Sequence, residues 1–205
     1  MLDLIGGQPS ASLPEAVLRQ GAAAVLAERR GPGIWMFAYG ALLWDCTAAQ
    51  DEQRPGEVGG LSARYNLRDE RSRGTPDRPS LTLGLQPDRG PCLGAALHLP
   101  EQDLAENFWQ VWKQEMPQGA YEARWVQVRT EAGMLDAVTF VVDPAHPLFA
   151  GAVPEDEVAQ ILAATSGPGG TAADYLRRTA EAMRRLGMRD AYLEGLQDKV
   201  TQFGS

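Results

Sequence analysis

The sequence predicts an α+β fold in which a mixed, strongly curved β-sheet is flanked by helices. Strand-like segments cluster in the centre of the chain, and helical segments lie at both ends. A parallel, doubly wound sheet fits this order less well, because its strands and helices alternate along the chain. We expect one globular domain overall.

The first part of the chain predicts a helix followed by an apolar strand. Residues 16–29 continue a helical pattern that ends at Arg-Gly-Pro-Gly, a sequence that stops helices. A short apolar strand at 34–37 follows and leads into a second apolar group at 42–44. Residues 45–57 are polar and predict a surface loop.

The centre of the chain predicts strands and one helix. Three strand-like runs lie at 58–67, 81–85 and 92–99, and turns are expected between them at 74–76 and 87–90. Residues 100–116 have helical spacing, and 121–142 predict a hairpin around Glu-Ala-Gly. The chain is then helical to its end, with helices predicted near 154–165, 171–186 and 189–202.

Composition limits the classes of partner. The chain has 205 residues, 44% of them hydrophobic, which is enough for an ample core. Its 19 Lys and Arg against 27 Asp and Glu give a formal charge of -8, which disfavours nucleic acid and anionic membrane as partners. A small molecule or a protein is the expected partner, and the sequence does not fix the oligomeric state.

The two cysteines, Cys46 and Cys92, predict neither a disulfide framework nor a zinc site. They lie on separate segments without a CxxC pattern or a nearby histidine pair, so we expect two free, mostly buried thiols and no metal site. The N-terminus lacks a signal-peptide pattern, and the longest uncharged apolar run, 34–44, is too short to cross a bilayer. We therefore expect a cytoplasmic protein.

The most informative residue is Glu115, because it falls on the apolar face of its helix. At about 100° per residue it lies within roughly 60° of Leu104, Phe108 and Trp112, whereas Glu106 falls on the opposite face. A buried acid is either paired or functional. The pattern alone leaves both open: a carboxylate satisfied by an arginine such as Arg64 or Arg124 or by a backbone amide, or a general acid/base of raised pKa.

The segment Phe37-Ala38-Tyr39-Gly40-Ala41-Leu42 is the second candidate site. An apolar strand ends there in a glycine between an aromatic and a small residue, and a turn at this point would expose consecutive N–H groups able to hold a carboxylate or an oxyanion. A strand-end turn without any ligand has the same pattern. Both interpretations therefore stay open on spacing alone.

Other polar groups predict structural roles. The Gly-Pro-Gly-Gly run at 167–170 lacks the lysine and hydroxyl residue of a P-loop and predicts an interhelical turn. His98 and His146 lie far from any nucleophile motif, so structural roles are favoured for both. The run 68–73 mixes charge signs and predicts a solvated loop, and the arginines of 177–185 predict the solvent face of a helix.

Six runs of residues occur in a characteristic order. They lie at 34–44 (IWMFAYGALLW), 73–79 (RGTPDRP), 114–116 (QEM), 139–147 (TFVVDPAHP), 166–170 (SGPGG) and 174–176 (DYL). In this order they resemble the successive signatures of ChaC-type γ-glutamylcyclotransferases. The resemblance covers about residues 34–198. It implies that residues 34–205 form the family's domain and that residues 1–33 are a helical extension packed on it.

The resemblance implies a small mixed β-barrel flanked by helices. It also implies cleavage of glutathione to 5-oxoproline and cysteinylglycine without metal or cofactor. Glu115 would move the proton, and backbone amides from Tyr39 to Leu42 would hold the γ-glutamyl group. It further places Tyr175 near the substrate and carries Arg73 as a loop residue that faces an anionic ligand.

Two residues depart from the family's pattern. Ala38 and Ala41 stand where the family usually has glycine and serine, so a hydroxyl that could contact substrate is absent. Three hypotheses therefore remain: a glutathione-specific enzyme, a cyclotransferase for other γ-glutamyl amines or dipeptides, and a non-catalytic γ-glutamyl-binding module. An unpaired buried acid would cost a binding module about 1 to 3 kcal/mol of stability, which argues against the third.

Overall fold

The structure is a computed structural model that describes residues 11–203. Its contacts divide the chain into two compact units. The first unit contains Ala63–Gly84 and the chain from Pro144 onward, and the second contains Ala11–Ser62 and Leu85–Asp143. The expected single domain with a 1–33 extension therefore stays a prediction.

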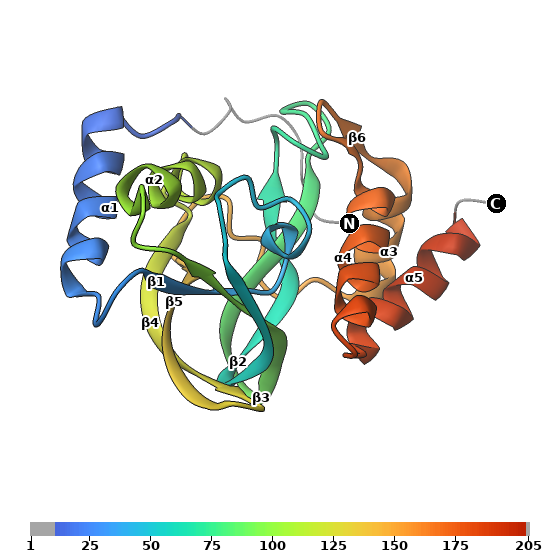
Figure 1. Cartoon of the computed structure of the whole chain (residues 1–205). Coiled ribbons are helices and arrows are strands. Elements are labelled where there is room, and N and C mark those ends of the chain that lie inside the picture. The colour runs from blue at the N-terminus through green and yellow to red at the C-terminus, as the bar shows by residue number, and fades with distance from the viewer. Residues whose placement is uncertain (1–10, 204–205) are drawn as a thin grey trace. The chain divides into compact units, whose positions relative to one another are not determined.

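The second unit contains most of a closed five-stranded barrel with the strand order β1-β3-β2-β4-β5 (Figure 1). The sheet is mixed, because β5 runs parallel to β1 and β3 while the other recorded pairs are antiparallel. The expected α+β fold with a mixed, curved sheet is confirmed. The strands are β1 (Ile34–Ala38), β2 (Glu52–Asp69), β3 (Ser80–Leu99), β4 (Tyr121–Thr130) and β5 (Gly133–Val142).

Strand β5 supplies much of the barrel core because its residues are apolar without interruption from Ala137 to Val142, apart from the buried Thr139. It forms a long antiparallel hairpin with β4, from Tyr121 paired with Val142 to Thr130 paired with Gly133. The hairpin predicted from the Glu-Ala-Gly turn is confirmed.

Two helices belong to this unit and lie side by side, α1 (Glu15–Glu28) and α2 (Leu104–Glu115) (Figure 1). Helix α2 buries one face, with Phe108 and Val111 fully covered, while Glu106 on the opposite face is exposed. The apolar spacing of the sequence therefore placed the faces of α2 correctly. A short 3₁₀ helix, Ala41–Leu43, follows β1.

The first unit gathers three helices, α3 (Glu155–Ala164), α4 (Ala172–Arg185) and α5 (Ala191–Phe203), which pack on one another (Figure 1). Leu162, Leu176, Met183 and Leu196 form their core. The predicted turn at 167–170 is a small hairpin of β6 (Ser166–Gly167) and β7 (Gly170–Thr171).

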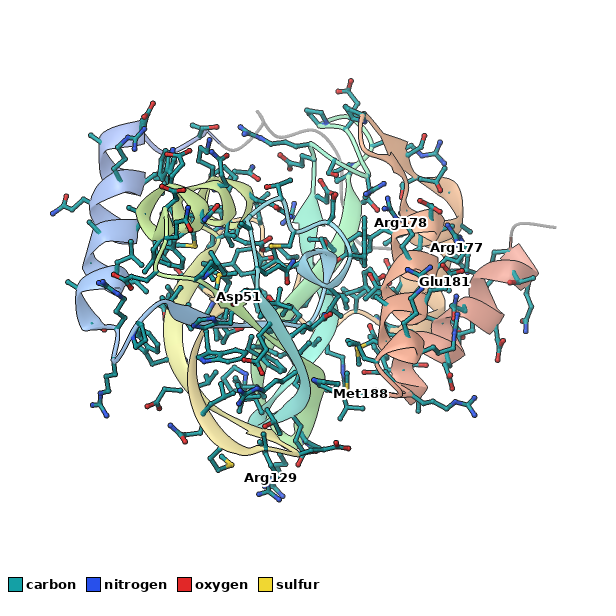
Figure 2. The ribbon with its side chains drawn as sticks, in the orientation of Figure 1. Asp51, Arg129, Arg177, Arg178, Glu181 and Met188 are labelled. Carbon is teal, nitrogen blue, oxygen red and sulfur yellow. The ribbon has the colours of Figure 1, made fainter. Side chains whose placement is uncertain are left out.

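The outer face of α4 carries its charges, as the sequence predicts. Arg177 is exposed and forms an ion pair with Glu181, one turn further along the helix (Figure 2). It forms a second ion pair with Asp174, one turn before it. Such exposed pairs contribute at most about 1 kcal/mol each, so they are typical of a solvated helix face.

Two strand boundaries were predicted wrongly. Strand β2 begins at Glu52, inside the expected loop 45–57, and β3 runs without a break through the expected turn at Pro87–Gly90. Residues 87–89 of β3 are exposed, and a strand tolerates proline where its missing N–H would face solvent. Polar and turn-forming residues in the exposed parts of long strands concealed them.

The described residues hold no helix long and apolar enough to span a membrane.

The end of β1 depends on Gly94 of β3. A Cβ at Gly94 would collide with the carbonyl oxygen of Ala38 and lie 2.8 Å from Cζ of Phe37. We predict that Gly94→Ala lowers the free energy of unfolding by about 1 to 3 kcal/mol, because neither the strand backbone nor the buried ring can move freely. Gly90→Ala in the same strand has open space at its Cβ and is the control. Equal urea midpoints for the two variants would contradict the prediction.

Candidate active site

Glu115 is the last residue of α2 and is half-buried at the end of that helix. Burial raises the pKa of its carboxyl from 4.5 to about 7, because the charged form loses hydration that the protein does not replace. Within residues 11–203 no hydrogen bond or ion pair to this carboxyl is formed. Glu115 is therefore an acid that ionises near neutral pH and keeps some access to solvent.

The two arginines considered as structural partners of Glu115 are engaged elsewhere. Arg124 pairs with Glu122 at 2.6 Å. Arg64 donates to the carbonyl of Ala63 and lies 4.6 Å above the ring of Tyr192. The structural interpretation of Glu115 as half of an arginine ion pair is wrong.

A thiol is the titratable neighbour of Glu115 on the segment after the 3₁₀ helix. The pKa of Cys46 is raised chiefly by burial, and the nearby charge of Glu115 raises it further, against a lowering hydrogen bond from the backbone of Ala48. Within residues 11–203, neither Cys46 nor Cys92 is part of a disulfide. No motif indicates that Cys46 lies near Glu115, because about 70 residues separate the two in the chain.

Strand β5 connects the helix of Glu115 to the predicted binding segment. The Tyr39 hydroxyl donates to the carbonyl oxygen of Phe140 at 2.8 Å, and the Phe140 ring lies 6.0 Å from the ring of Trp112, one turn before Glu115. Thr139 donates its hydroxyl to the carbonyl oxygen of Phe37 at 2.9 Å. The end of β1 and the end of α2 are therefore fixed against one strand.

The segment 37–42 has two parts. Phe37 and Ala38 are fully buried in β1, so their side chains belong to the core. The chain then turns, and the N–H of Leu43 donates to the carbonyl of Gly40 at 3.0 Å. For the described part of the chain, no acceptor is recorded for the N–H groups of residues 40–42. Three consecutive amide donors of this kind suit an anionic group.

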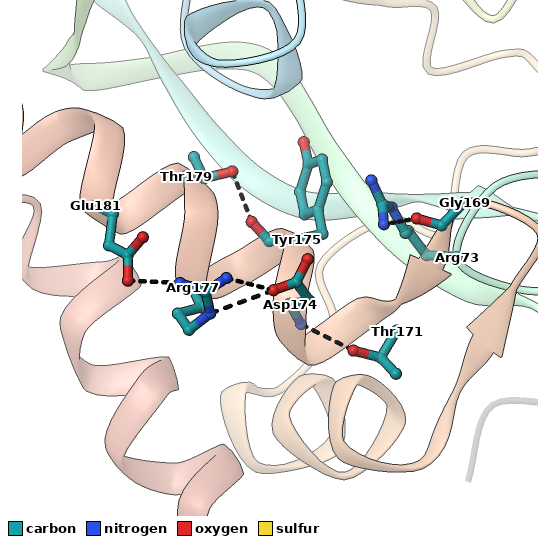
Figure 3. Close-up of polar contacts among 8 residues, drawn as sticks. All are labelled: Arg73, Gly169, Thr171, Asp174, Tyr175, Arg177, Thr179 and Glu181. Atoms are coloured by element: carbon teal, nitrogen blue, oxygen red, sulfur yellow. Dashed lines mark hydrogen bonds and ion pairs between the residues drawn. The ribbon is translucent and has the colours of Figure 1, made fainter.

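Arg73 and Tyr175, the other two predicted site residues, lie together in the first unit (Figure 3). The Arg73 guanidinium lies 5.8 Å from the Tyr175 ring and donates to the carbonyl of Gly169 in the β6–β7 hairpin. The Tyr175 ring, on the first turn of α4, meets the Tyr65 ring edge-on at 6.2 Å. The side chains of Arg73, Tyr175 and Tyr65 are all buried.

The loop that carries Arg73 is organised around Asp69, which sequence reasoning missed. The Asp69 carboxylate accepts the backbone N–H groups of Arg71, Ser72 and Arg73 at 2.8 to 3.0 Å. Arg73 is only 7% exposed, so the expected solvated loop at 68–73 is wrong at this residue. The signal available was an Asp at the start of a short polar run, which is typical of Asx-type turns.

The remaining polar candidates have structural partners. His98 pairs with Asp51 at 2.7 Å, and its other ring nitrogen lies 3.4 Å from the carbonyl of Pro32. His146 accepts the N–H of Leu148. Among residues 11–203 there is no cluster of three acidic, histidine or cysteine side chains that could hold a metal ion.

A family model described as "ChaC-like protein" matches residues 34–203. The chain belongs to this family. Two relatives of this ChaC-like protein are named glutathione-specific γ-glutamylcyclotransferases. The one from Escherichia coli K12 is 35% identical over 86% of this chain and 75% of its own length. The one from Mus musculus is 30% identical over 82% of this chain and 78% of its own length.

The fold of the ChaC-like chain is also found in a solved structure. A yeast γ-glutamyl cyclotransferase specific to glutathione aligns with a TM-score of 0.76 at 20% identity, over 84% of this chain and 97% of the other. At this identity the likeness shows the fold alone. Helix α1 lies outside the residues that the family model matches.

We predict that Glu115→Gln is more stable than the wild-type ChaC-like protein above pH 7. The native state holds the Glu115 proton more tightly than the unfolded state does, so stability is full below the unfolded pKa of 4.5 and is lost as pH rises through about 7. Glutamine resembles the protonated acid and has no charge to bury. The free energy of unfolding of Glu115→Gln should therefore exceed that of the wild type by up to about 3 kcal/mol at high pH.

The measurement is the free energy of unfolding in urea at pH 5 and pH 8. The advantage of Glu115→Gln should be large at pH 8 and small at pH 5. Glu106→Gln, on the exposed face of the same helix, is the matched control and should show little difference at either pH. A Glu115→Gln advantage that does not change with pH would contradict the raised pKa.

Proposed function

We propose that this chain is a γ-glutamylcyclotransferase that cleaves glutathione to 5-oxoproline and cysteinylglycine. The family of the chain and the names of its relatives support the reaction class and the substrate. The observation that carries the proposal is the Glu115 carboxyl, which has no ion pair in the described residues and has a pKa of about 7. A general acid/base is most effective when its pKa lies near the working pH.

The reaction is an intramolecular aminolysis. The α-amine of the γ-glutamyl group attacks its own side-chain carbonyl, a bond forms between that nitrogen and the carbonyl carbon, and the bond from that carbon to the cysteinyl nitrogen breaks. Because both reacting groups belong to one substrate, the enzyme only has to hold the substrate folded, and this orientation supplies much of the acceleration. No covalent enzyme intermediate is required.

Glu115 carries the protons in this proposal. Its carboxylate takes a proton from the substrate ammonium and later delivers it to the leaving nitrogen. Two protons pass in total from the α-nitrogen to the cysteinyl nitrogen, and a carboxylate that accepts and then donates ends each turnover ionised, as it began. The residual solvent access of Glu115 is consistent with a group that a substrate can reach.

The amide donors of residues 40–42 are the proposed anion cradle. They would hold the γ-glutamyl group and stabilise the oxyanion that forms on its carbonyl. Ala41 has no hydroxyl, so this cradle acts through backbone N–H groups, which an alanine supplies as well as a serine. Tyr175 and Arg73 stay proposed substrate contacts on the strength of the family resemblance.

A cytoplasmic location completes the proposal. Reduced glutathione is maintained in the cytosol, where a thiol-containing substrate would be available.

We predict that Glu115→Gln lowers the rate of glutathione cleavage by about 10²-fold or more, because the amide cannot accept the ammonium proton. The assay is release of cysteinylglycine and 5-oxoproline from reduced glutathione, with circular dichroism to show that the fold is kept. Glu106→Gln is the control from the exposed face of α2 and should match the wild type. The wild-type kcat should rise with pH through about 7, since Glu115 must be ionised to accept a proton. Unchanged turnover by Glu115→Gln would overturn its proposed role.

A substrate panel separates the alternatives. We expect 5-oxoproline from glutathione at a higher kcat/KM than from γ-glutamyl dipeptides that lack the glycine. The reverse order would favour a cyclotransferase for other γ-glutamyl amines. Binding of γ-glutamyl compounds without release of 5-oxoproline from any of them would instead favour a non-catalytic binding module.

A further inference from the structure

The N-terminal segment 11–33, which precedes the residues matched by the family model, is attached to the helix of Glu115 at three points. We refer to this segment, which contains α1, as the N-terminal clamp. Figure 1 shows α1 running alongside α2, and both helices belong to the same compact unit.

The clamp holds both ends of α2. Before the helix, Glu101 accepts the N–H of Gly33 at 2.8 Å and pairs with Arg29 at 3.0 Å. After the helix, the carbonyl of Pro117, two residues beyond Glu115, accepts the N–H of Leu13 at 2.8 Å. The chain segments on either side of α2 are thus tied to the two ends of one neighbouring helix.

The middle contact is between Gly21 and the indole of Trp112. A Cβ built at Gly21 would lie 2.7 Å from Cζ2 of Trp112, so only glycine allows α1 to approach this closely. Trp109 lies one turn before Trp112, and the Arg19 guanidinium of α1 lies 4.3 Å above the Trp109 ring. Close backbone approach through a helical glycine fixes the distance between the two helices.

Packing alone determines where the Trp112 indole lies. In the part of the chain that the structure describes, its buried N–H has no hydrogen-bond partner. Its neighbours are the rings of Phe108 at 5.7 Å and Phe140 at 6.0 Å, together with Gly21. Trp112 lies one helical turn before Glu115, so a displaced indole would displace the turn that carries the carboxyl.

The clamp acts on Glu115 through shape rather than charge. The charged groups of α1 are engaged elsewhere: Glu15 pairs with Arg19, and Glu28 accepts the indole N–H of Trp125. On the segment after the 3₁₀ helix, the titratable group near Glu115 is the thiol of Cys46, which does not belong to the clamp.

We propose that the N-terminal clamp positions Glu115, and that Gly21 and Trp112 are the positioning residues through which it acts. The proposal rests on the proposed role of Glu115 in proton transfer. It assigns to residues 11–33 a function that the family segment does not contain: they set the position and the water exposure of the proton carrier.

The test is Gly21→Ala compared with Gly195→Ala. Both replace a helical glycine and give the same gain in helix propensity, but a Cβ at Gly195 in α5 meets open space. Gly21→Ala should lower kcat for glutathione by about tenfold with little change in KM. It should also move the rising limb of the pH profile down by about half a unit, because water admitted beside Glu115 favours its charged form. Gly195→Ala should match the wild type in both.

The pKa of Glu115 is measured independently of turnover, by ¹³C NMR of its carboxyl carbon with Glu115→Gln to assign the signal. It should fall in Gly21→Ala and not in Gly195→Ala. Trp112→Phe removes the ring atom that the new Cβ meets, so the double variant Gly21→Ala/Trp112→Phe should have the same pKa and kcat as Trp112→Phe alone. Glu101→Gln weakens a different attachment and should shift the pKa in the same direction by less.

The outcomes separate the two proposals. A melting temperature lowered in Gly21→Ala with the Glu115 pKa and pH profile unchanged would overturn the positioning role and leave the clamp merely structural. A wild type that does not cleave glutathione, with a Glu115 pKa that still falls in Gly21→Ala, would overturn the proposed function and support the positioning role. If Gly21→Ala does not fold, Glu101→Gln is the deciding variant. An unchanged Glu115 pKa in Glu101→Gln would then overturn the positioning role of the clamp.

Discussion

The desolvation of one unpaired carboxyl, that of Glu115, is the constraint on which the site depends. Hydrogen-bond donors or an arginine beside it would stabilise its charge and lower its pKa, and the group would then be ionised permanently. The carbonyl end of α2, where Glu115 lies, disfavours negative charge for the same reason that helix C-termini favour cations. One turn before Glu115, the Trp112 ring lies 6.0 Å from the Phe140 ring, so this part of the helix packs on apolar atoms.

An unpaired Glu115 lowers the stability of the native state, and packing elsewhere in the second unit has to compensate for this. Above neutral pH the ionised acid destabilises the native state, so the surrounding packing has to fix its position without bonding to it. The structure does this through neighbours. Tyr39 is bonded to the backbone of Phe140, Phe37 to the side chain of Thr139, and Trp112 is held by rings. Hydrogen bonds are formed around the carboxyl rather than to it.

The sequence predicted the features that follow from periodicity and failed where tertiary contacts decide. The inward face of α2 was predictable because helical spacing places Glu115 beside Trp112 and Glu106 opposite, whatever the rest of the chain does. The extent of β3 was not, because Pro87 and the residues after it read as a turn unless the long strand is known to be exposed there. The burial of Arg73 also depended on contacts with distant residues, Gly169 and Tyr175.

The candidate site divides in the same way. Family resemblance supplied its members, but it gave no account of Asp69, which orders the Arg73 loop, or of the α1 contacts with α2, because neither lies in a recognisable motif. Gly21 is a single glycine in an alanine-rich helix, and only the position of Trp112 explains why a larger residue is absent. A contact between two single residues, such as Gly21 and Trp112, produces no repeating pattern that could be recognised in the sequence.

The thiol beside Glu115 has a chemical consequence for an enzyme that handles a thiol compound. Because burial and the adjacent carboxylate raise the pKa of Cys46, little of it is thiolate at neutral pH. Thiol–disulfide exchange requires the thiolate, so glutathione disulfide would react with Cys46 only slowly. The electrostatics that keep Glu115 protonatable therefore also protect the neighbouring cysteine from forming a mixed disulfide with the oxidised form of the proposed substrate.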